Sequence, residues 1–280
     1  MSTLLISLSA MLSLGFTHFV NGMVVEKDFP VRLAFFTHLG GSLVALILAL
    51  QFSNWSSAAG WWGIVAGAGS ACGALFLYKG LAVSSFGVVV PVSSVSMMVI
   101  ALAFSMVLLG ELPTTVMMMG VVIAIPGLWL VSAGGPAQKL HAALPASRGV
   151  LMGLGAGLGF AVQLLVLGQV KDASALYAIA ACMFFGALWL APYSRLKTVA
   201  LRNASISAVA GGISATGLAL YIFSLQGSLA LTSIVIISLY PLVPVLLGSF
   251  FRKESVGLRR LAGIGLSIIA TTLIALGNGY

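Results

Sequence analysis

Long apolar runs separated by short polar breaks recur along this entire sequence. An α-helix needs about 20 residues to cross the roughly 30 Å of hydrocarbon in a bilayer, and ten runs approach or exceed that length. We expect them at residues 3–23, 32–52, 60–82, 86–109, 114–133, 149–169, 174–192, 204–225, 229–251 and 257–276. The pattern therefore predicts an all-α membrane protein with ten transmembrane helices.

Composition agrees with this prediction and removes several other classes. Only 6% of the 280 residues are charged, which is too few to cover the surface of a soluble domain. The net charge of +8 does not indicate nucleic-acid binding, because the basic residues stand singly between apolar runs. Cys72 and Cys182 lie inside apolar runs without a CxxC or metal-ligand spacing, so we expect free, buried thiols and no metal or cofactor. The first run lacks a basic start and a cleavage site, so we expect a first span rather than a signal peptide.

The basic residues predict the orientation. Of the 13 Lys and Arg residues, only Lys171 falls in a loop that follows an even-numbered run. Positive loops remain in the cytoplasm, so both termini are expected outside a bacterial inner or plasma membrane. Lys79, at the end of the third run, is expected to extend to the cytoplasmic surface rather than to bind an anion.

The second half of the chain resembles the first when the sequence is shifted by 143 positions (254 − 111). The matching pairs are Leu77-Tyr78 with Leu220-Tyr221, Glu111 with Glu254, Gly120 with Gly263, and Gly134 with Gly277. Because each half holds five runs, an odd number, the two copies must cross the membrane in opposite directions. We therefore divide the chain into a first repeat at 1–134, a central loop at 135–148 and a second repeat at 149–280, placed around a central cavity.

Two of the repeated residues are carboxylates that stand where a helix is about to begin. Glu111 precedes Pro113, which fits the first turn of a helix, and Glu254 occupies the matching place in the second half. A carboxylate there accepts hydrogen bonds from unpaired backbone N–H groups. Glu111 and Glu254 are therefore interpreted as structural caps, in preference to proton carriers or cation ligands.

A Leu-Tyr pair, a Ser or Pro cluster and a Glu followed by glycines occur in both halves. In this combination the chain resembles the EamA-type members of the drug/metabolite transporter superfamily. Those proteins often carry Arg after the Glu, where this chain has Leu112 and Ser255. The resemblance implies ten helices around a central cavity and the transport of small metabolites, often amino acids, across the cytoplasmic membrane.

Polar side chains inside the runs are the candidates for contact with a transported solute, because they are costly in lipid and face the protein interior. They are His18, Asn21, His38, Ser42, Ser93, Ser94, Gln163 and Tyr240. The two histidines either contact the solute or carry protons, or else they are neutral groups that bond to neighbouring backbone or hydroxyls.

Prolines and repeated tyrosines are candidates for gates or kinks. Pro91 lies in the fourth run, and Pro241 and Pro244 lie in the ninth, its repeat mate. Prolines free backbone carbonyls, so they either open a transport site at corresponding places or only shape the bundle. Tyr78 and Tyr221 are either gates or anchors at the membrane interface.

The five acidic residues all lie at the ends of runs, so a neutral or zwitterionic solute is expected. The sequence thus predicts a secondary active transporter, an exporter or exchanger of small metabolites such as amino acids, that works by alternating access. The alternative is a proton-coupled exporter of lipophilic or toxic compounds. An enzyme is not favoured, since no catalytic motif lies at mid-membrane depth, and an inverted repeat makes a purely structural subunit less favoured. If protons are coupled to transport, His18 and His38 are expected to carry them.

Overall fold

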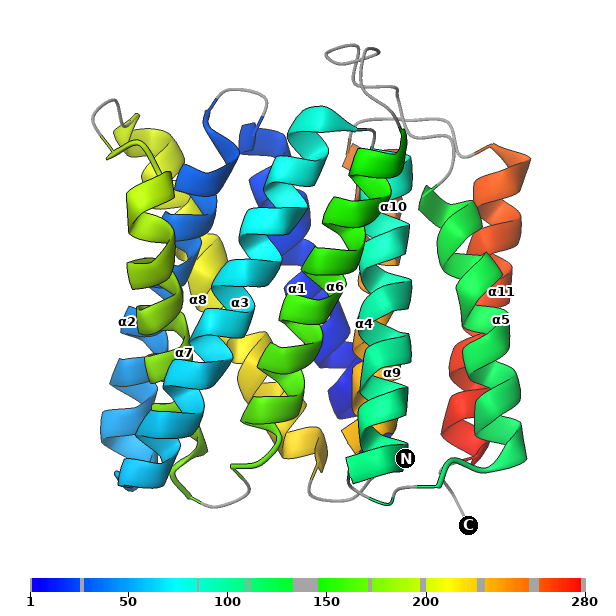
Figure 1. Cartoon of the computed structure of the whole chain (residues 1–280), viewed down its shortest axis with the longest axis horizontal. Coiled ribbons are helices and arrows are strands. Elements are labelled where there is room, and N and C mark those ends of the chain that lie inside the picture. The colour runs from blue at the N-terminus through cyan, green and yellow to red at the C-terminus, as the bar shows by residue number, and fades with distance from the viewer. Residues whose placement is uncertain are drawn as a thin grey trace.

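A computed structural model describes residues 2–25, 28–84, 86–108, 110, 112–132, 146–170, 173–196, 200–225, 230–251 and 257–277. The regular structure in these residues is helical throughout. The helices stand side by side, with Ser2 and Gly277, where the first and last helices begin and end, at the same end of the bundle (Figure 1). The elements are α1 (Ser2–Val25), α2 (Pro30–Phe52), α3 (Ser57–Val83), α4 (Phe86–Leu108), α5 (Thr115–Ser132), α6 (Ala146–Leu167), α7 (Ala175–Leu190), η1 (Ala191–Tyr193), α8 (Leu201–Ser224), α9 (Ala230–Ser238), α10 (Leu242–Phe251) and α11 (Leu258–Gly277).

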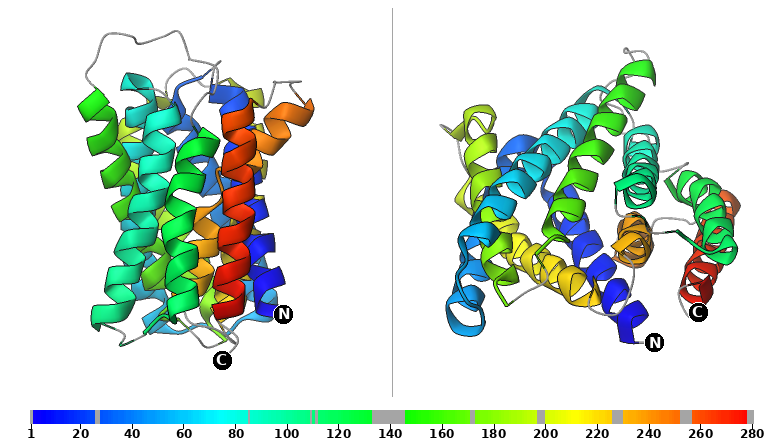
Figure 2. Two further views of the ribbon diagram at one scale, coloured as in Figure 1. Left: turned by 90° about the vertical axis from the view of Figure 1, so that its right-hand side faces the viewer. Right: turned by 60° about the horizontal axis from the view of Figure 1, so that its bottom comes forward.

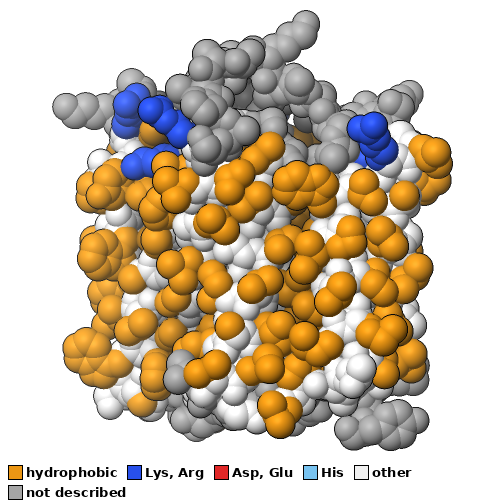
Figure 3. All heavy atoms as spheres, turned by 45° about the vertical axis from the view of Figure 1, so that its right-hand side comes forward, with side chains coloured by type: hydrophobic (Ala, Val, Ile, Leu, Met, Phe, Trp, Pro, Cys, Tyr) orange, Lys and Arg blue, Asp and Glu red, His pale blue; other side chains and the backbone are white. Residues whose placement is uncertain are grey.

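The outer surface of the bundle is apolar, as expected for contact with lipid. Within the described residues, eight helices are long and apolar enough to cross a membrane, namely α1–α4, α6–α8 and α11, and shorter apolar helical stretches occupy 115–131 and 232–248. Large apolar side chains such as Leu50 and Trp61 are more than half exposed. Hydrophobic side chains cover most of the face that Figure 3 shows. The Lys and Arg side chains visible on this face gather at one end of the bundle, which we call the basic end. The described chain is thus a multi-pass membrane protein.

The predicted ninth span, residues 229–251, is wrong as a single helix. It consists of α9 and α10, joined by turns at 239–241. Pro241 and Pro244 have no N–H to donate, so the carbonyls of Ile237 and Tyr240 accept from Tyr240 N (2.9 Å) and Val243 N (3.0 Å) instead. These tighter bonds to the third residue back replace α-helical bonds, and the helix breaks in the middle of the span.

The corresponding break in the first half does not form. Pro91 lies only five residues from the start of α4, which continues as one helix through it to Leu108. The predicted central loop also ends early, because α6 begins at Ala146. Thr114 caps α5, since its hydroxyl accepts from Met117 N at 3.2 Å. The predicted caps Glu111 and Glu254 lie outside the described residues.

Glycines allow the central helices to cross closely. A methyl group on Gly67 of α3 would lie 2.6 Å from the Cys182 carbonyl oxygen of α7. One on Gly211 of α8 would overlap the Thr37 carbonyl of α2, and Gly41 lies at the same crossing. Both crossings involve backbone against backbone, so any side chain there would force helices apart. These contacts hold α3 against α7 and α2 against α8.

The α5–α11 pair lies at one edge of the bundle, where the two helices pack mainly on each other (Figures 1 and 2). The broken helix α9–α10 contacts α1, and its α9 half also contacts α4. The turn itself presses on α1: a methyl group on Gly15 would lie 2.8 Å from the Tyr240 carbonyl oxygen. The break is therefore buried against the interior face of α1 rather than exposed to lipid.

A candidate solute-binding cavity at the centre of the bundle

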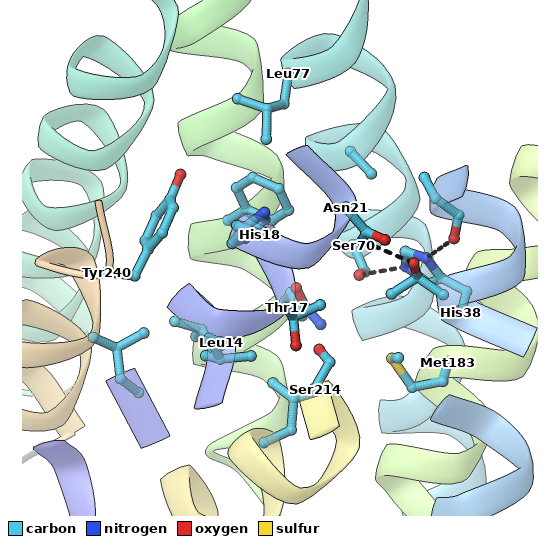
Figure 4. Close-up of a pocket in the computed structure, with 18 of the residues that line it drawn as sticks. Leu14, Thr17, His18, Asn21, His38, Ser70, Leu77, Met183, Ser214 and Tyr240 are labelled. Atoms are coloured by element: carbon cyan, nitrogen blue, oxygen red, sulfur yellow. Dashed lines mark hydrogen bonds between the residues drawn. The ribbon is translucent and has the colours of Figure 1, made fainter. Parts of the chain in front are cut away.

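Eight helices, α1–α4 and α6–α9, together with Tyr240 in the turn after α9, enclose a central cavity. It offers about 90 Å³ to the centres of water molecules, several times the space that one water needs. The lining residues are Leu14, Thr17, His18, Asn21, Ala34, Thr37, His38, Ser70, Ala74, Leu77, Tyr78, Met97, Phe160, Gln163, Leu164, Met183, Ser214, Leu218, Ile237 and Tyr240. Figure 4 shows α1 side chains in the middle, between Tyr240 on one side and His38 on the other.

One wall of the central cavity is a hydrogen-bonded polar cluster. His38 Nδ1 lies 2.8 Å from the Ala34 carbonyl oxygen, and Nε2 lies 2.8 Å from Ser70 Oγ. A carbonyl only accepts, so Nδ1 carries a proton, and in the neutral ring Nε2 accepts from the Ser70 hydroxyl. His38 thus has both ring nitrogens engaged by protein, which matches the alternative of a histidine bonded to backbone and hydroxyl.

The other histidine is placed differently. The His18 ring stacks at a tilt on Tyr240, with 4.7 Å between ring centroids, and no hydrogen bond joins it to the described residues. The Tyr240 hydroxyl faces Ser93 and Ser94 of α4, although no bond of standard geometry connects the three buried hydroxyls. The ring nitrogens of His18 and the hydroxyl of Tyr240 are therefore available for hydrogen bonds with a solute or water in the cavity.

Asn21 stands between these two groups. Its amide nitrogen donates to Thr37 Oγ1 at 2.9 Å, while its Oδ1 accepts no hydrogen bond of standard geometry from the described residues. The Tyr78 hydroxyl faces this amide from α3. A buried polar atom without a partner costs about 1–3 kcal/mol, and a bound solute or water would recover that cost. This side of the cavity can therefore donate and accept hydrogen bonds.

The central cavity brings together six of the predicted residues: His18, Asn21, His38, Gln163, Tyr240 and Tyr78. The remaining candidates Ser42, Ser93, Ser94, Pro91, Pro241, Pro244 and Tyr221 do not line it. Ser42 bonds to the carbonyl of Leu39 in its own helix at 2.8 Å. Tyr221 is fully buried and donates to the Leu164 carbonyl at 2.8 Å. The interfacial-anchor interpretation is wrong for both tyrosines, because Tyr78 is also buried.

Polar residues that the sequence analysis did not single out also line the cavity: Thr17, Thr37, Ser70 and Ser214. For two of them a signal exists in the sequence. The pattern AGxxSAxG occurs at 66–73 and again at 210–217, one position out of register with the shift of 143. Its serines are Ser70 of α3 and Ser214 of α8, and both face the central cavity. Among the described residues that line the cavity, none is a Lys, Arg, Asp or Glu.

Comparison with known proteins gives the family. Residues 1–133 match the EamA-like transporter family. No curated protein matches the sequence. Among solved structures 29 chains match, and one crystal structure, described only as that of a protein, superimposes with a TM-score of 0.77 at 16% identity, covering 98% of this chain and 96% of that one. At this identity the likeness shows the fold alone. Residues 1–133 are thus identified by this match with the EamA-like transporter family, which is part of the drug/metabolite transporter superfamily.

Proposed function

We propose that this membrane transporter is a secondary active carrier, an exporter or exchanger, of a small neutral or zwitterionic metabolite such as an amino acid. The observation that carries the proposal is the lining of the central cavity. Its described residues combine hydroxyl, amide and imidazole groups with apolar side chains, and none of them is charged. An unpaired ionic solute would be costly to bury there. A neutral solute, or a zwitterion whose own charges compensate each other, could be held by the unpartnered groups of Asn21 and Tyr240.

We further propose that the ten spans form two inverted repeats of five, with α9 and α10 together as the ninth span. The proposal keeps the division at 1–134 and 149–280 and counts the start of α6, from Ala146, with the second repeat. The contacts between helices support this proposal. In the two repeats α3 corresponds to α8, α1 to α6 and α2 to α7. The contacts match: α3 packs on α6 and α7, and α8 packs on α1 and α2. The pairs α2–α7 and α5–α11 map onto themselves, as expected for helices beside a two-fold axis.

The basic end is proposed to face the cytoplasm, which places both termini outside. Polar contacts close the bundle at each end of the cavity. At the basic end the Asp28 carboxylate bonds to Arg32 and Asn203, and at the other end Ser233 bonds to Ser7 and Ser224. We propose that these two closures open alternately during transport.

Counterflow into proteoliposomes tests the function. Vesicles are preloaded with a mixed amino-acid pool, and protein-dependent entry of individual labelled amino acids is followed. Gln163→Ala is expected to raise the KM, because Gln163 lines the central cavity. Gln169→Ala removes the same amide from the exposed turn that follows α6 and is the matched control. If no amino acid accumulates, the amino-acid proposal fails, and nucleosides, sugars and lipophilic compounds are tested next.

A second candidate function is the export of lipophilic compounds, which the apolar share of the lining supports, with Met97, Phe160 and Met183 as its larger members. Resistance of expressing cells to lipophilic toxic compounds, combined with absent amino-acid counterflow, would favour it. Proton coupling is tested separately with His18→Gln and His38→Gln. If flux keeps the same pH dependence when both rings are replaced, the histidines do not carry the coupling proton.

A further inference from the structure

A second hollow, which we call the vestibule, opens at the basic end of the bundle. It is lined by Phe29, Pro30, Val31, Tyr78, Lys79, Pro192, Tyr193 and Arg195. It offers about 290 Å³ to the centres of water molecules, more than three times the space in the central cavity. Tyr78 lines both hollows, so the vestibule and the central cavity lie next to each other at this side chain.

Two cationic side chains in the vestibule make cation–π contacts with aromatic rings. Lys79 Nζ lies 5.2 Å from the centre of the Tyr193 ring, and the Arg195 guanidinium carbon lies 4.9 Å from the centre of the Phe29 ring. Such contacts hold a cation in place without neutralising it. No carboxylate in the described part of the chain pairs with either one. Nearby Arg32, by contrast, is paired with Asp28 at 2.9 Å.

The backbone also holds Arg195 in an unusual conformation. Its φ is +48°, and it is the only non-glycine with a positive φ among the described residues. It follows η1 closely, at the position after a helix end where glycine or asparagine usually occupies this left-handed region. A non-glycine residue there carries a conformational cost of about 1–2 kcal/mol. Glycine would form this turn without that cost. We therefore take the arginine side chain, rather than the turn, as the reason for arginine at this position.

We propose that the vestibule is an oxyanion site, in which Lys79 and Arg195 bind a carboxylate or phosphate group at the basic end. Guanidinium and ammonium groups form charge-assisted hydrogen bonds with either oxyanion, and the aromatic rings beneath them keep both cations turned toward the hollow. This reverses the expectation that Lys79 only extends to the surface. Two sources share this chemistry. One is the carboxylate of the transported solute, which rests on the proposed function, and the other is the phosphate of an anionic lipid.

Titration of inorganic phosphate tests the site without any assumption about transport. The full-length protein is placed in nanodiscs of phosphatidylcholine, and its melting temperature is followed as phosphate replaces chloride at constant ionic strength. Phosphate is expected to stabilise the protein, and Lys79→Gln with Arg195→Gln should weaken its apparent affinity roughly tenfold or more. Lys79→Arg keeps the charge and should retain binding. Arg148→Gln removes an exposed cation at the same end but outside the vestibule, and should behave as the wild type.

If the wild type gains no stability from phosphate, or if Arg148→Gln loses the response as fully as the double variant, the oxyanion site is refuted. Two further arms identify the source of the anion once the site is established. If phosphatidylglycerol in the nanodisc abolishes the phosphate response of the wild type, a lipid phosphate occupies the vestibule. If the double variant raises the counterflow KM for solute offered from the basic end only, the solute carboxylate does. Failed counterflow with an intact phosphate response would refute the proposed function and leave the site standing.

Discussion

Asp28 is expected to control the stability of the basic end. Its Oδ1 accepts from Phe29 N at 2.7 Å and from Arg32 Nη1 at 2.9 Å, while Oδ2 accepts from Asn203 Nδ2 at 3.2 Å. Arg32 Nε in turn donates to the Ser194 carbonyl at 3.3 Å. The two charged side chains are only 7% and 4% exposed. One carboxylate therefore joins the start of α2 to the start of α8 and, through Arg32, to the segment after η1.

Asp28→Ala should lower the free energy of unfolding because it leaves the Arg32 charge buried without its carboxylate partner. Removing one partner of a buried ion pair costs about 3–5 kcal/mol, because the other charge stays buried. Arg32 keeps its bond to the Ser194 carbonyl, so we expect the lower end, about 3 kcal/mol. Asn203→Ala removes only one hydrogen bond to the carboxylate, which is worth about 1.5 kcal/mol. Replacing the pair together, Asp28→Ala with Arg32→Met, should recover most of the loss, since an apolar pair often substitutes for a buried ion pair.

Thermal unfolding of the purified protein at a fixed scan rate measures these differences, with the four proteins of the Asp28 and Arg32 double-mutant cycle compared directly. At roughly 2–4 °C per kcal/mol, Asp28→Ala should lower the melting temperature by about 6–12 °C. Asn203→Ala should lower it by no more than half as much. If Asp28→Ala costs no more than Asn203→Ala, or if the double variant is as unstable as the sum of the single ones, the ion pair does not hold this end together.

Three further changes separate packing from solute contact. Gly211→Ala should prevent assembly of the bundle, because its methyl group overlaps backbone atoms. The methyl group of Gly265→Ala meets nothing within 4 Å, so this variant should raise stability by up to about 1 kcal/mol. The yield of monodisperse protein measures both effects. Tyr221→Phe should cost about 1 kcal/mol of stability without changing the transport KM, while Tyr240→Phe should change the KM. Ser70→Ala removes the hydroxyl that bonds to the imidazole in the cavity wall and should lower counterflow, with unchanged flux contradicting a role for that wall.

The spans could be predicted because lipid imposes one requirement on every residue that it touches. A run of apolar residues must form a helix in the bilayer, and its length is set by the bilayer thickness. Side chains such as His18, Asn21 and Gln163 could be placed in the interior by the same rule, since they are expensive in lipid. All three line the central cavity.

The role of each polar residue could not be predicted in this way, because it depends on the neighbours that other helices supply. His18 and His38 look alike in sequence, yet His38 meets a carbonyl and a hydroxyl, while His18 meets a tyrosine ring. The contact that Lys79 makes could not be predicted for the same reason. Its partner ring, Tyr193, comes from a segment 114 residues later (193 − 79), and no local pattern connects the two.

The prolines show how one local rule gives two outcomes in matched helices. A proline removes one donor, and α4 loses its single donor near its beginning, where Pro91 interrupts only one early turn. The ninth span carries Pro241 and Pro244 three residues apart near its middle, so two consecutive turns lose a donor and the chain shifts to tighter turns. The bond from Leu242 N then goes to Leu239 at 3.0 Å rather than to Ser238. The break places the Tyr240 ring against His18. The cavity wall beside Pro241 and Pro244 is therefore polar.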